Sequence, residues 1–540
     1  MPIAWGSWEL VLRSACSPKL GCAPPKSETM RLLLTTITTD NKKSDLELRY
    51  LYSVLADAPI ELDMKRYGRY ETCADIYEDI MQGLYDLVYF HTDSENILSI
   101  SSVAQMVKKA SQETGVMLGG MEVSFETHDF MRDHPYVDYV VRGEGETVLY
   151  NFVRGLLQLN YNFATMAGLA YRTEDGIKVN PFDDPIEMNE LPFPYDKTES
   201  GKGTVYYESI RGTSDRSIHR QYLPDPRVRS LSINRVCTEL RYFLVKDVEK
   251  VVFFDQWFNF NTERAYRIFE YIINNDNGVT SFEFNMNGDK IDDDIIRLLA
   301  DAREGLFTLN IDIGSTNAEV LGAMGRRENV YQLMYNVTKL MRESNVSINI
   351  FIASGLPYET ESMFARSFNK SYGLAAGMPI HIQHLYADKG TTLRKQAERY
   401  GYIHSEVAPY EVISSGHMSS SQILRIKKIS RVVDAFIGDG GFKMSVPRIL
   451  NDTGIRPYEF FKSLSIFIGD EGLENKMVRK EDQSRILYAF TEQLYRELSD
   501  ESKLEMLQDV ILQDLEDMIS VEDIKRFERQ GWDLNRREDN

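Results

Sequence analysis

Two glycine-rich turns in the first third of the sequence have residue types suited to binding a ligand. One reads Leu-Gly-Gly-Met-Glu-Val and the other reads Val-Arg-Gly-Glu-Gly-Glu, and each follows an apolar run. Glycine has no side chain, so the backbone of such a turn can approach a bulky ligand closely. The pattern therefore predicts a ligand-binding crevice. Its glycines are Gly119, Gly120, Gly143 and Gly145.

An alternation of apolar runs and helix-period segments between residues 30 and 158 positions these turns. This alternation predicts a doubly wound parallel sheet, in which ligands bind at the carboxyl ends of the strands. Both glycine turns follow such strand ends. The expected strands are 31–36, 60–62, 85–90, 116–119 and 136–141, and the expected helices are 46–56, 74–83, 97–110 and 147–156.

A second alternation of strands and helices occupies residues 204–390. It predicts a partial (β/α)6 barrel of the TIM type, whose chemistry lies at the C-terminal ends of its strands. Asp255, Asn259 and Gly355 follow such ends. The expected strands are 205–209, 250–254, 281–286, 307–313, 347–352 and 379–386.

Three further segments complete the expected organisation. Residues 159–203 form a connector that the Leu-Pro-Phe-Pro run at its end makes extended and stiff. Residues 391–540 are expected to form a helical cap or interaction module, because apolar periodicity continues there without a chemical motif. Residues 1–29 are expected to be a disordered N-terminal extension.

The charge balance restricts the class of partner. The formal charge is 62 − 82 = −20, and an acidic surface repels nucleic-acid phosphates and anionic lipids, so we expect neither as a partner. Basic positions such as Arg326 and Arg327 are interpreted as solvated loop ends. The 4 cysteines follow no metal-binding pattern, and reduced thiols without a long apolar run predict a cytoplasmic protein.

The two turns, the Leu-Pro-x-Pro connector and the barrel segments together resemble radical S-adenosylmethionine (SAM) proteins that carry a cobalamin-binding domain. The resemblance implies cobalamin as a ligand and extends its site to Glu122, Arg142 and Glu144. It also implies SAM near Asp255, Asn259 and Gly355. For Asp255 and Asn259 the alternative is capping of the next helix, and for Gly355 it is an ordinary strand end.

His91 adds a further possibility at the predicted cobalamin site. It follows the third strand of the first unit, where its ring either faces the cobalt or forms a local hydrogen bond.

In the proteins that this chain resembles, the loop after the first barrel strand carries Cys-x3-Cys-x2-Cys, which holds an iron–sulfur cluster. At that spacing this chain has Thr213, Ser217 and Arg220. Neutral hydroxyls are poor ligands for such clusters, and a guanidinium cannot ligate iron. Relatives also have long polar side chains where this chain has Asn285, Asn310 and Gly314. The resemblance therefore implies the fold, but an iron–sulfur cluster is not expected.

Three functions remain open from the sequence. The first is a degenerate radical SAM-like protein that binds cobalamin without reductive SAM cleavage. Such a protein would act as a carrier, a sensor, or a partner of an intact radical SAM paralogue or of a peptide substrate.

The second is an active cobalamin-dependent enzyme for methyl transfer or radical chemistry with a non-standard site. Its candidate nitrogen ligands are His219, His381, His384 and His417. The third is an interaction scaffold that binds no cofactor.

Overall fold

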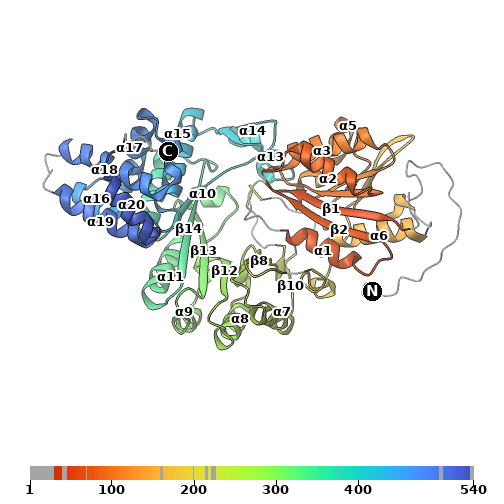
Figure 1. Cartoon of the computed structure of the whole chain (residues 1–540), viewed down its shortest axis with the longest axis horizontal. Helices are drawn as coiled ribbons and strands as arrows, with labels where there is room; N and C mark the ends of the chain where they lie inside the picture. The colour runs from red at the N-terminus through yellow and green to blue at the C-terminus, as the bar shows by residue number, and fades with distance from the viewer. Residues whose placement is uncertain are drawn as a thin grey trace.

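Two sheets and a helical C-terminal region make up the protein, which we describe from a computed structural model (Figure 1). The structure describes residues 29–38, 45–68, 70–158, 162–198, 200–212, 217–220, 227–375, 377–497 and 503–534. The extension predicted at 1–29 therefore lies outside the described residues except for its last residue. Within the described ranges, no helix is long and apolar enough to cross a membrane.

The first sheet has 7 strands in the order β2-β1-β3-β4-β5-β6-β7. The first five strands in sequence are parallel, and β6 and β7 pair antiparallel to their neighbours. The strands are β1 (Arg31–Ile37), β2 (Glu61–Tyr67), β3 (Leu87–His91), β4 (Gly115–Gly119), β5 (Tyr139–Val141), β6 (Leu169–Thr173) and β7 (Gly176–Val179).

Helices cover both faces of this sheet, which confirms the doubly wound prediction. Leu33 and Val88 face one helical layer, and Leu34 and Tyr89 face the other, because successive strand residues point to opposite sides. One layer contains α1 (Leu46–Leu55) and α6 (Gly145–Gln158). The other contains α2 (Cys73–Gln82), α3 (Ile97–Ala110) and α5 (Thr127–Asp133), and the short α4 (Met121–Ser124) follows β4.

Two strands of the first sheet lie in the segment that we expected to be only a connector. β6 and β7 fall within residues 159–203 and extend the sheet beyond β5. β6 buries Leu169, Ala170 and Tyr171, whereas β7 is largely exposed. Such a short hairpin buries few side chains, so its apolar pattern is weak in the sequence.

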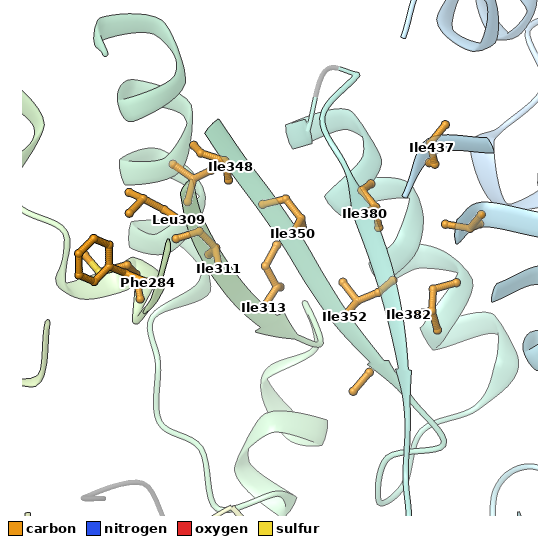
Figure 2. Packing of buried hydrophobic residues seen from close by; sticks show 14 of the residues in the cluster. Phe284, Leu309, Ile311, Ile313, Ile348, Ile350, Ile352, Ile380, Ile382 and Ile437 are labelled. Atoms are coloured by element: carbon orange, nitrogen blue, oxygen red, sulfur yellow. The ribbon is translucent and has the colours of Figure 1, made fainter. Parts of the chain in front are cut away.

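The second sheet has 6 parallel strands in the order β15-β14-β13-β12-β11-β8. The six-stranded partial barrel is confirmed, and its alternate residues pack against the outer helices, as Figure 2 shows for Ile311, Ile350 and Ile380. The strands are β8 (Thr204–Tyr207), β11 (Lys250–Phe253), β12 (Ser281–Met286), β13 (Phe307–Gly314), β14 (Ser347–Ser354) and β15 (Ile380–His384).

Several of the outer helices begin after a residue whose side chain caps the N-terminus. Ser232, Asn261 and Asp292 each accept a backbone N–H three residues later, which satisfies a donor in the first turn. The outer helices are α7 (Ile233–Val245), α8 (Thr262–Asn274), α9 (Asp293–Ala300), α10 (Ala318–Ala323), α11 (Val330–Glu343) and α12 (Glu361–Ala375). A small antiparallel pair, β9 (Ile210–Arg211) and β10 (Arg229–Ser230), follows β8.

Both edges of the partial barrel are covered. The Tyr195 hydroxyl exchanges hydrogen bonds with the backbone of Tyr206 on the β8 edge, at 2.5 and 3.2 Å. At the β15 edge, the Ser430 hydroxyl of α15 (Ser420–Ile437) donates to the carbonyl of Ile382 at 3.3 Å. These contacts satisfy backbone groups that an open edge would leave exposed.

The C-terminal region is mainly helical, as predicted, and shares one hydrophobic core with the barrel. Its helices are α13 (Thr392–Lys395), α14 (Ala397–Tyr400), α15, α16 (Ser445–Thr453), α17 (Pro457–Asp470), α18 (Lys480–Glu497), α19 (Leu504–Met518) and α20 (Val521–Gln530). It also contains the hairpin β16 (Ile403–His404) and β17 (Val412–Ser414). Short 3-10 helices occupy Phe163–Thr165, Met188–Glu190, Phe258–Phe260, Gly288–Lys290 and Glu474–Val478.

Candidate functional site

The first glycine turn follows β4 and is filled by the protein itself. A β-carbon built at Gly119 would lie 2.0 Å from the hydroxyl oxygen of Tyr89. Gly120 has a φ of 103°, and a β-carbon there would lie 2.2 Å from the carbonyl oxygen of Thr92. Packing and backbone conformation therefore already require both glycines. The role predicted for them against a ligand stays a prediction.

Glu122 connects this turn to the segment after the barrel. Its side chain is 1% exposed and accepts hydrogen bonds from the Lys389 amine at 2.8 Å and the Tyr410 hydroxyl at 2.5 Å. Burial and the bond to Glu122 raise the pKa of Tyr410. The second carboxylate oxygen of Glu122 is buried and has no hydrogen-bond partner in the described part of the chain. Glu122 thus acts as a contact between domains.

The second turn follows β5, and its charged residues also have protein partners. Arg142 donates to the carbonyl of Asn180 at 2.6 Å, and its guanidinium carbon lies 4.0 Å from the centre of the Phe182 ring. Gly143, with a φ of 79°, donates its N–H to the Ser124 hydroxyl at 2.9 Å. Arg142 and Gly143 therefore brace the loop against neighbouring segments of the first domain.

Glu144 reaches from this turn to the barrel. It accepts hydrogen bonds from the Arg229 guanidinium at 3.0 Å and from the N–H of Ile186 at 2.9 Å. Burial alone would raise the pKa of Glu144, but Arg229 and Arg211 outweigh it, so the pKa is lowered. Gly145 starts α6, where a β-carbon would lie 3.2 Å from Leu51. All seven predicted cobalamin-site residues therefore lie at the carboxyl edge of the first sheet.

His91 ends β3 at the same edge, directly beside Gly119 in the strand register. Its backbone carbonyl accepts hydrogen bonds from the Thr36 hydroxyl at 2.9 Å and the Asn96 amide at 3.3 Å. Its ring nitrogen Nδ1 is buried and has no hydrogen-bond partner in the described ranges. The local hydrogen bond that the sequence left open for this ring is therefore absent there.

Asp255 and Asn259 lie at the carboxyl edge of the second sheet, and both are fully buried. Asp255 accepts hydrogen bonds from the N–H groups of Ser209 and Ile210 at 2.6 and 2.9 Å, and burial raises its pKa to about 6. Asn259 exchanges hydrogen bonds with the backbone of Asn287 at 2.8 and 2.9 Å. Neither residue caps α8, because Asn261 does so. Both fasten neighbouring strand-end loops together.

Gly355 follows β14 with a φ of 78°. Its N–H donates to the Glu359 carboxylate at 3.0 Å, and its carbonyl accepts from the Tyr402 hydroxyl at 2.8 Å. Among the described residues, the one atom within 4.0 Å of a β-carbon built there is Cδ1 of Ile423, so this glycine leaves space that Gly119 and Gly120 do not. Burial raises the pKa of Glu359 to about 8.

The structure describes part of the loop after β8, where similar proteins carry their three cluster-binding cysteines. Thr213 lies outside the described residues, and Ser217 is fully buried. The Arg220 guanidinium lies 4.0 Å from a carboxylate oxygen of Asp312, and its carbon lies 5.7 Å from the centre of the Trp257 ring. A hydroxyl and a cation do not match the thiolates that iron–sulfur clusters require. The described ligand set therefore does not fit a cluster.

Arg326 was predicted to be a solvated loop end, and this prediction is wrong. Arg326 is 4% exposed, and its guanidinium binds the Asp312 carboxylate at 3.0 Å and the Glu328 carboxylate at 2.9 Å. A β-carbon at Gly314 would lie 2.6 Å from this guanidinium, so the missing side chain makes room for it. Burial would raise the pKa of Asp312, but Arg326 and Arg220 lower it.

A row of side-chain amides crosses the inner face of the barrel sheet. Asn349 donates to Asn310 at 2.9 Å, Asn310 donates to Asn285 at 3.2 Å, and Asn285 donates to the carbonyl of Asp255 at 2.9 Å. The strand register aligns the three asparagines. Two of them, Asn285 and Asn310, occupy positions where the resemblance implies longer polar side chains. Asn349 was not singled out from the sequence, although its strand position matches the others.

Family models divide the chain in the same way as the geometry. A B12 binding domain matches residues 32–153, and the radical SAM superfamily matches residues 215–370. The chain pairs a B12-binding domain with a radical SAM domain. A third model, described as a protein of unknown function (DUF4080), matches residues 398–533 and covers most of the C-terminal helical region.

Curated relatives match parts of these two domains. An uncharacterized methyltransferase of Pyrococcus horikoshii is 27% identical over 207 residues, which are 36% of this chain and 44% of that protein. The anaerobic magnesium-protoporphyrin IX monomethyl ester cyclase of Rubrivivax gelatinosus is 31% identical over 86 residues, 15% of this chain and 16% of that protein. The chain thus spans less than half the length of these relatives.

Solved structures share the fold of the paired domains. The cobalamin-dependent SAM radical enzyme OxsB, with aqua-cobalamin and SAM bound, has a TM-score of 0.59 at 12% identity and covers 94% of this chain and 85% of its own. The radical SAM methyltransferase TsrM of Kitasatospora setae has a TM-score of 0.55 at 16% identity, covering 69% and 77%. At these identities the likeness is one of fold.

Two of the histidines considered as ligands for a non-standard metal site lie on β15 of the radical SAM domain and are engaged elsewhere. His381 lies 3.2 Å from the Asp434 carboxylate, and His384 lies 2.9 Å from the Ser354 hydroxyl. Burial and Lys427 lower the pKa of His384 to about 4. Across the part of the chain that the structure describes, no three His, Cys, Asp or Glu residues are grouped to hold a metal ion.

Proposed function

We propose that this chain binds cobalamin through its B12-binding domain and neither assembles an iron–sulfur cluster nor cleaves SAM reductively. It acts as a cobalamin carrier, a sensor, or the partner of an intact radical SAM enzyme. The observation that carries the proposal is Arg220, a cation at a cluster-ligand position, held beside Trp257 and Asp312.

The surroundings of Arg220 support the loss of the cluster. Arg326 pairs with Asp312 and Glu328, so the buried charges there already have partners of opposite sign. Breaking such a pair to admit another group would leave an uncompensated buried charge. Without a cluster, the low-potential electron that radical SAM chemistry needs has no carrier in the chain.

The first sheet supports the cobalamin part of the proposal. In a doubly wound sheet, ligands bind at the carboxyl ends of the strands, and the seven predicted residues gather at that edge. Gly119 and Gly120 supply no free space, because Tyr89 and Thr92 fill it. The fit to cobalamin therefore depends on His91, whose buried Nδ1 has no hydrogen-bond partner in the described ranges.

Two measurements on the full chain test the two parts of the proposal separately. Equilibrium dialysis against hydroxocobalamin should give stoichiometric retention with a shift of the visible spectrum. Anaerobic incubation with iron, sulfide, SAM and a strong reductant should give no 5′-deoxyadenosine above the protein-free background. Absence of retention would favour the cofactor-free scaffold, and catalytic 5′-deoxyadenosine formation would refute the loss of reductive cleavage.

A further inference from the structure

We propose that Glu208 forms a pH-sensitive contact between the B12-binding domain and the barrel. The contact is tight while the carboxyl group of Glu208 keeps its proton, and it weakens when that group ionises. The inference concerns the interface between the domains and does not depend on a bound cofactor, so it goes beyond the proposed function. It rests on five charged side chains that meet there and are called the interface cluster: Glu144, Glu146, Glu208, Arg211 and Arg229.

The interface cluster draws its members from both domains. Glu144 precedes α6 and Glu146 lies in its first turn, whereas Glu208 follows β8, Arg211 ends β9 and Arg229 starts β10. All five side chains are between 6% and 16% exposed. The Arg211 guanidinium lies 2.6 Å from Glu146, 2.8 Å from Glu208 and 3.8 Å from Glu144. One guanidinium of the barrel therefore serves carboxylates on both sides of the interface.

The interface cluster holds more negative groups than positive ones. Three carboxylates face two guanidiniums, so the charge with every group ionised is 2 − 3 = −1. The charged pairs around the cluster do not change this balance. On α7, Glu239 pairs with Arg235 at 2.7 Å, and the charge of Arg264 on α8 stabilises the carboxylate of Asp255. A buried charge without a partner is unfavourable, and a carboxyl group avoids it by keeping its proton.

Two tyrosines complete the surroundings of the cluster without adding charge. The guanidinium carbon of Arg211 lies 5.1 Å from the centre of the Tyr50 ring on α1, and the Tyr207 hydroxyl of β8 donates to Glu239 at 2.6 Å. Burial raises the pKa of both phenols well above the usual value, so both are neutral near neutral pH. The excess negative charge is therefore removed by protonation of one of the three carboxyl groups.

Glu208 is the carboxyl group with the weakest support from cations. Glu144 accepts from Arg229 at 3.0 Å in addition to its contact with Arg211, and these cations outweigh burial, so its pKa is lowered. Glu146 makes the shorter contact with Arg211, at 2.6 Å. Glu208 has Arg211 at 2.8 Å and no second cation among the described residues. Burial raises the pKa of Glu208 to about 7, because Arg211 offsets the burial only in part.

The direction of the pH dependence follows from this raised pKa. Separation of the domains would expose Glu208 and return its pKa toward the ordinary value of 4.5. Between this value and about 7, the closed arrangement keeps a proton that the separated arrangement releases. The contact is therefore strongest below about pH 4.5, weakens as pH rises, and is weakest above about pH 7. The weakening is about tenfold per pH unit at most and about 300-fold over the whole interval.

Hydrogen–deuterium exchange of the full chain at about pH 6 and about pH 7.5, read by mass spectrometry, tests the inference. The reporter is the Ile186 amide, which donates to Glu144 at 2.9 Å across the interface. After correction for the intrinsic pH dependence of exchange, its protection should fall about tenfold from the lower to the higher pH. Glu208→Gln should remove most of this fall, because an amide side chain does not titrate.

Asp388→Asn is the matched control. Asp388 lies at another contact between the domains, where Ser94 donates to it, and burial raises its pKa to about 6. Most of its titration therefore lies below the pH interval of the measurement, and Asp388→Asn should keep most of the fall in protection.

Two results would overturn the inference. One is equal protection of Ile186 at the two pH values in the unmodified chain, and the other is a fall that Glu208→Gln leaves undiminished. The Phe282 amide inside the barrel, which donates to Leu306 at 2.8 Å, should show no change after correction. A parallel loss of its protection would mean that the barrel unfolds instead of separating from its neighbour, and would count against the inference equally.

A second variant keeps the test decisive if Glu208→Gln does not fold, as judged by circular dichroism. Glu146→Gln also balances the cluster, at 2 − 2 = 0, so Glu208 ionises at its ordinary pKa and the fall in protection should likewise disappear. A fall of the original size in Glu146→Gln would overturn the inference. Retention of hydroxocobalamin tests the proposed function separately, and neither result decides the other.

Discussion

At the carboxyl edge of the first sheet, the buried carboxylates Glu122 and Glu144 contact the rest of the protein, whereas at the corresponding edge of the second sheet Asp255 and Asp312 contact other barrel residues. Glu122 and Glu144 bind Lys389 and Arg229, which lie outside the first sheet's own domain. In the barrel, by contrast, Asp255 binds the backbone of Ser209, and Arg326 binds Asp312. Both edges therefore carry buried charge. The first edge contributes carboxylates to the contact between the domains, and the segment after β8 contributes Arg211 and Arg229.

The polar groups at the two edges can also be compared by the hydrogen bonds that they already make. At the barrel edge, a ligand that contacted Asp255 or Asn259 would have to replace hydrogen bonds that these residues already make. At the first edge, the carboxylates are also occupied, yet the His91 ring keeps a buried nitrogen without a partner in the described ranges. Buried polar atoms without a hydrogen-bond partner in the described ranges in fact occur at both edges, in His91 and Glu122 at the first and in Asp312 and Glu359 at the second.

The largest expected effect is all-or-none and concerns the barrel edge. Anaerobic reconstitution of the full chain with iron and sulfide should leave it without stoichiometric iron, whereas a four-iron cluster would give about four irons per chain. The reason is the replacement of thiolates by Thr213, Ser217 and Arg220. Iron analysis and visible absorption measure the outcome. The variant with all three positions changed to cysteine is the positive control and should gain iron.

Substitution of Arg326 should have the next largest effect. Arg326→Ala leaves Glu328 without its cation and Asp312 with only the more distant Arg220 at 4.0 Å, and breaking a buried pair costs about 3–5 kcal/mol. Urea unfolding measures the loss of stability. The adjacent Arg327 is exposed, so Arg327→Ala should change stability by less than about 0.5 kcal/mol. Equal effects of the two variants would mean that the buried network contributes nothing.

Arg326 also illustrates what the sequence could not reveal. β3 and β4 were recognisable because parallel strands buried on both faces have near-continuous hydrophobic sequences. The barrel strands β12, β13 and β14 were recognisable because apolar residues alternate with polar ones along them. The burial of Arg326 depends on Gly314 and on the return of the chain after β13, which no local pattern encodes.

The candidate site shows the same limit. The glycine turns and their place at the sheet edge were predictable from strand ends. The side chains that contact these turns were not predictable. Tyr89, which packs against Gly119, lies on a neighbouring strand, and Tyr410, which binds Glu122, is 288 residues away in the sequence. The β6–β7 hairpin was missed for a different reason. β6 buries Leu169, Ala170 and Tyr171, but β7 is largely exposed, so the hairpin has little apolar pattern.

Glu359 should make stability fall as pH rises. Burial raises its folded pKa from 4.5 to about 8, so the folded state holds the proton more tightly than the unfolded state. Its contribution is complete below about pH 4.5 and is lost as pH rises toward about 8, at roughly 1.4 kcal/mol per pH unit. Urea unfolding between these pH values should show the slope, and Glu359→Gln should flatten it. The exposed Glu398→Gln should leave it unchanged, and an equal slope in Glu359→Gln would contradict the assignment.

The contact between domains at Glu144 should contribute less. Glu144→Gln weakens its hydrogen bonds with Arg229, and bonds to charged groups contribute about 1.5–3 kcal/mol. The lowered pKa of Glu144 means that this contribution is present above the usual carboxyl range and is lost as pH falls through the folded value. Thermal unfolding should detect the change near neutral pH. Glu174→Gln, exposed in the same domain, is the control and should have no measurable effect.

The smallest effect is expected at an exposed ion pair between the same two parts of the protein, Glu126 with Arg394. Glu126 pairs with Arg394 at 3.1 Å, but its side chain is 45% exposed, and such surface pairs contribute about 0.2–1 kcal/mol. Glu126 has a φ of 53°, so Glu126→Gln is the suitable change, because substitution by glycine would relax the backbone and obscure the result. Thermal unfolding at low and high salt should show a small loss that salt removes, whereas the Glu144→Gln loss should persist. If Glu126→Gln destabilised the protein as much as Glu144→Gln, burial would not be what makes the first edge hold the domains together.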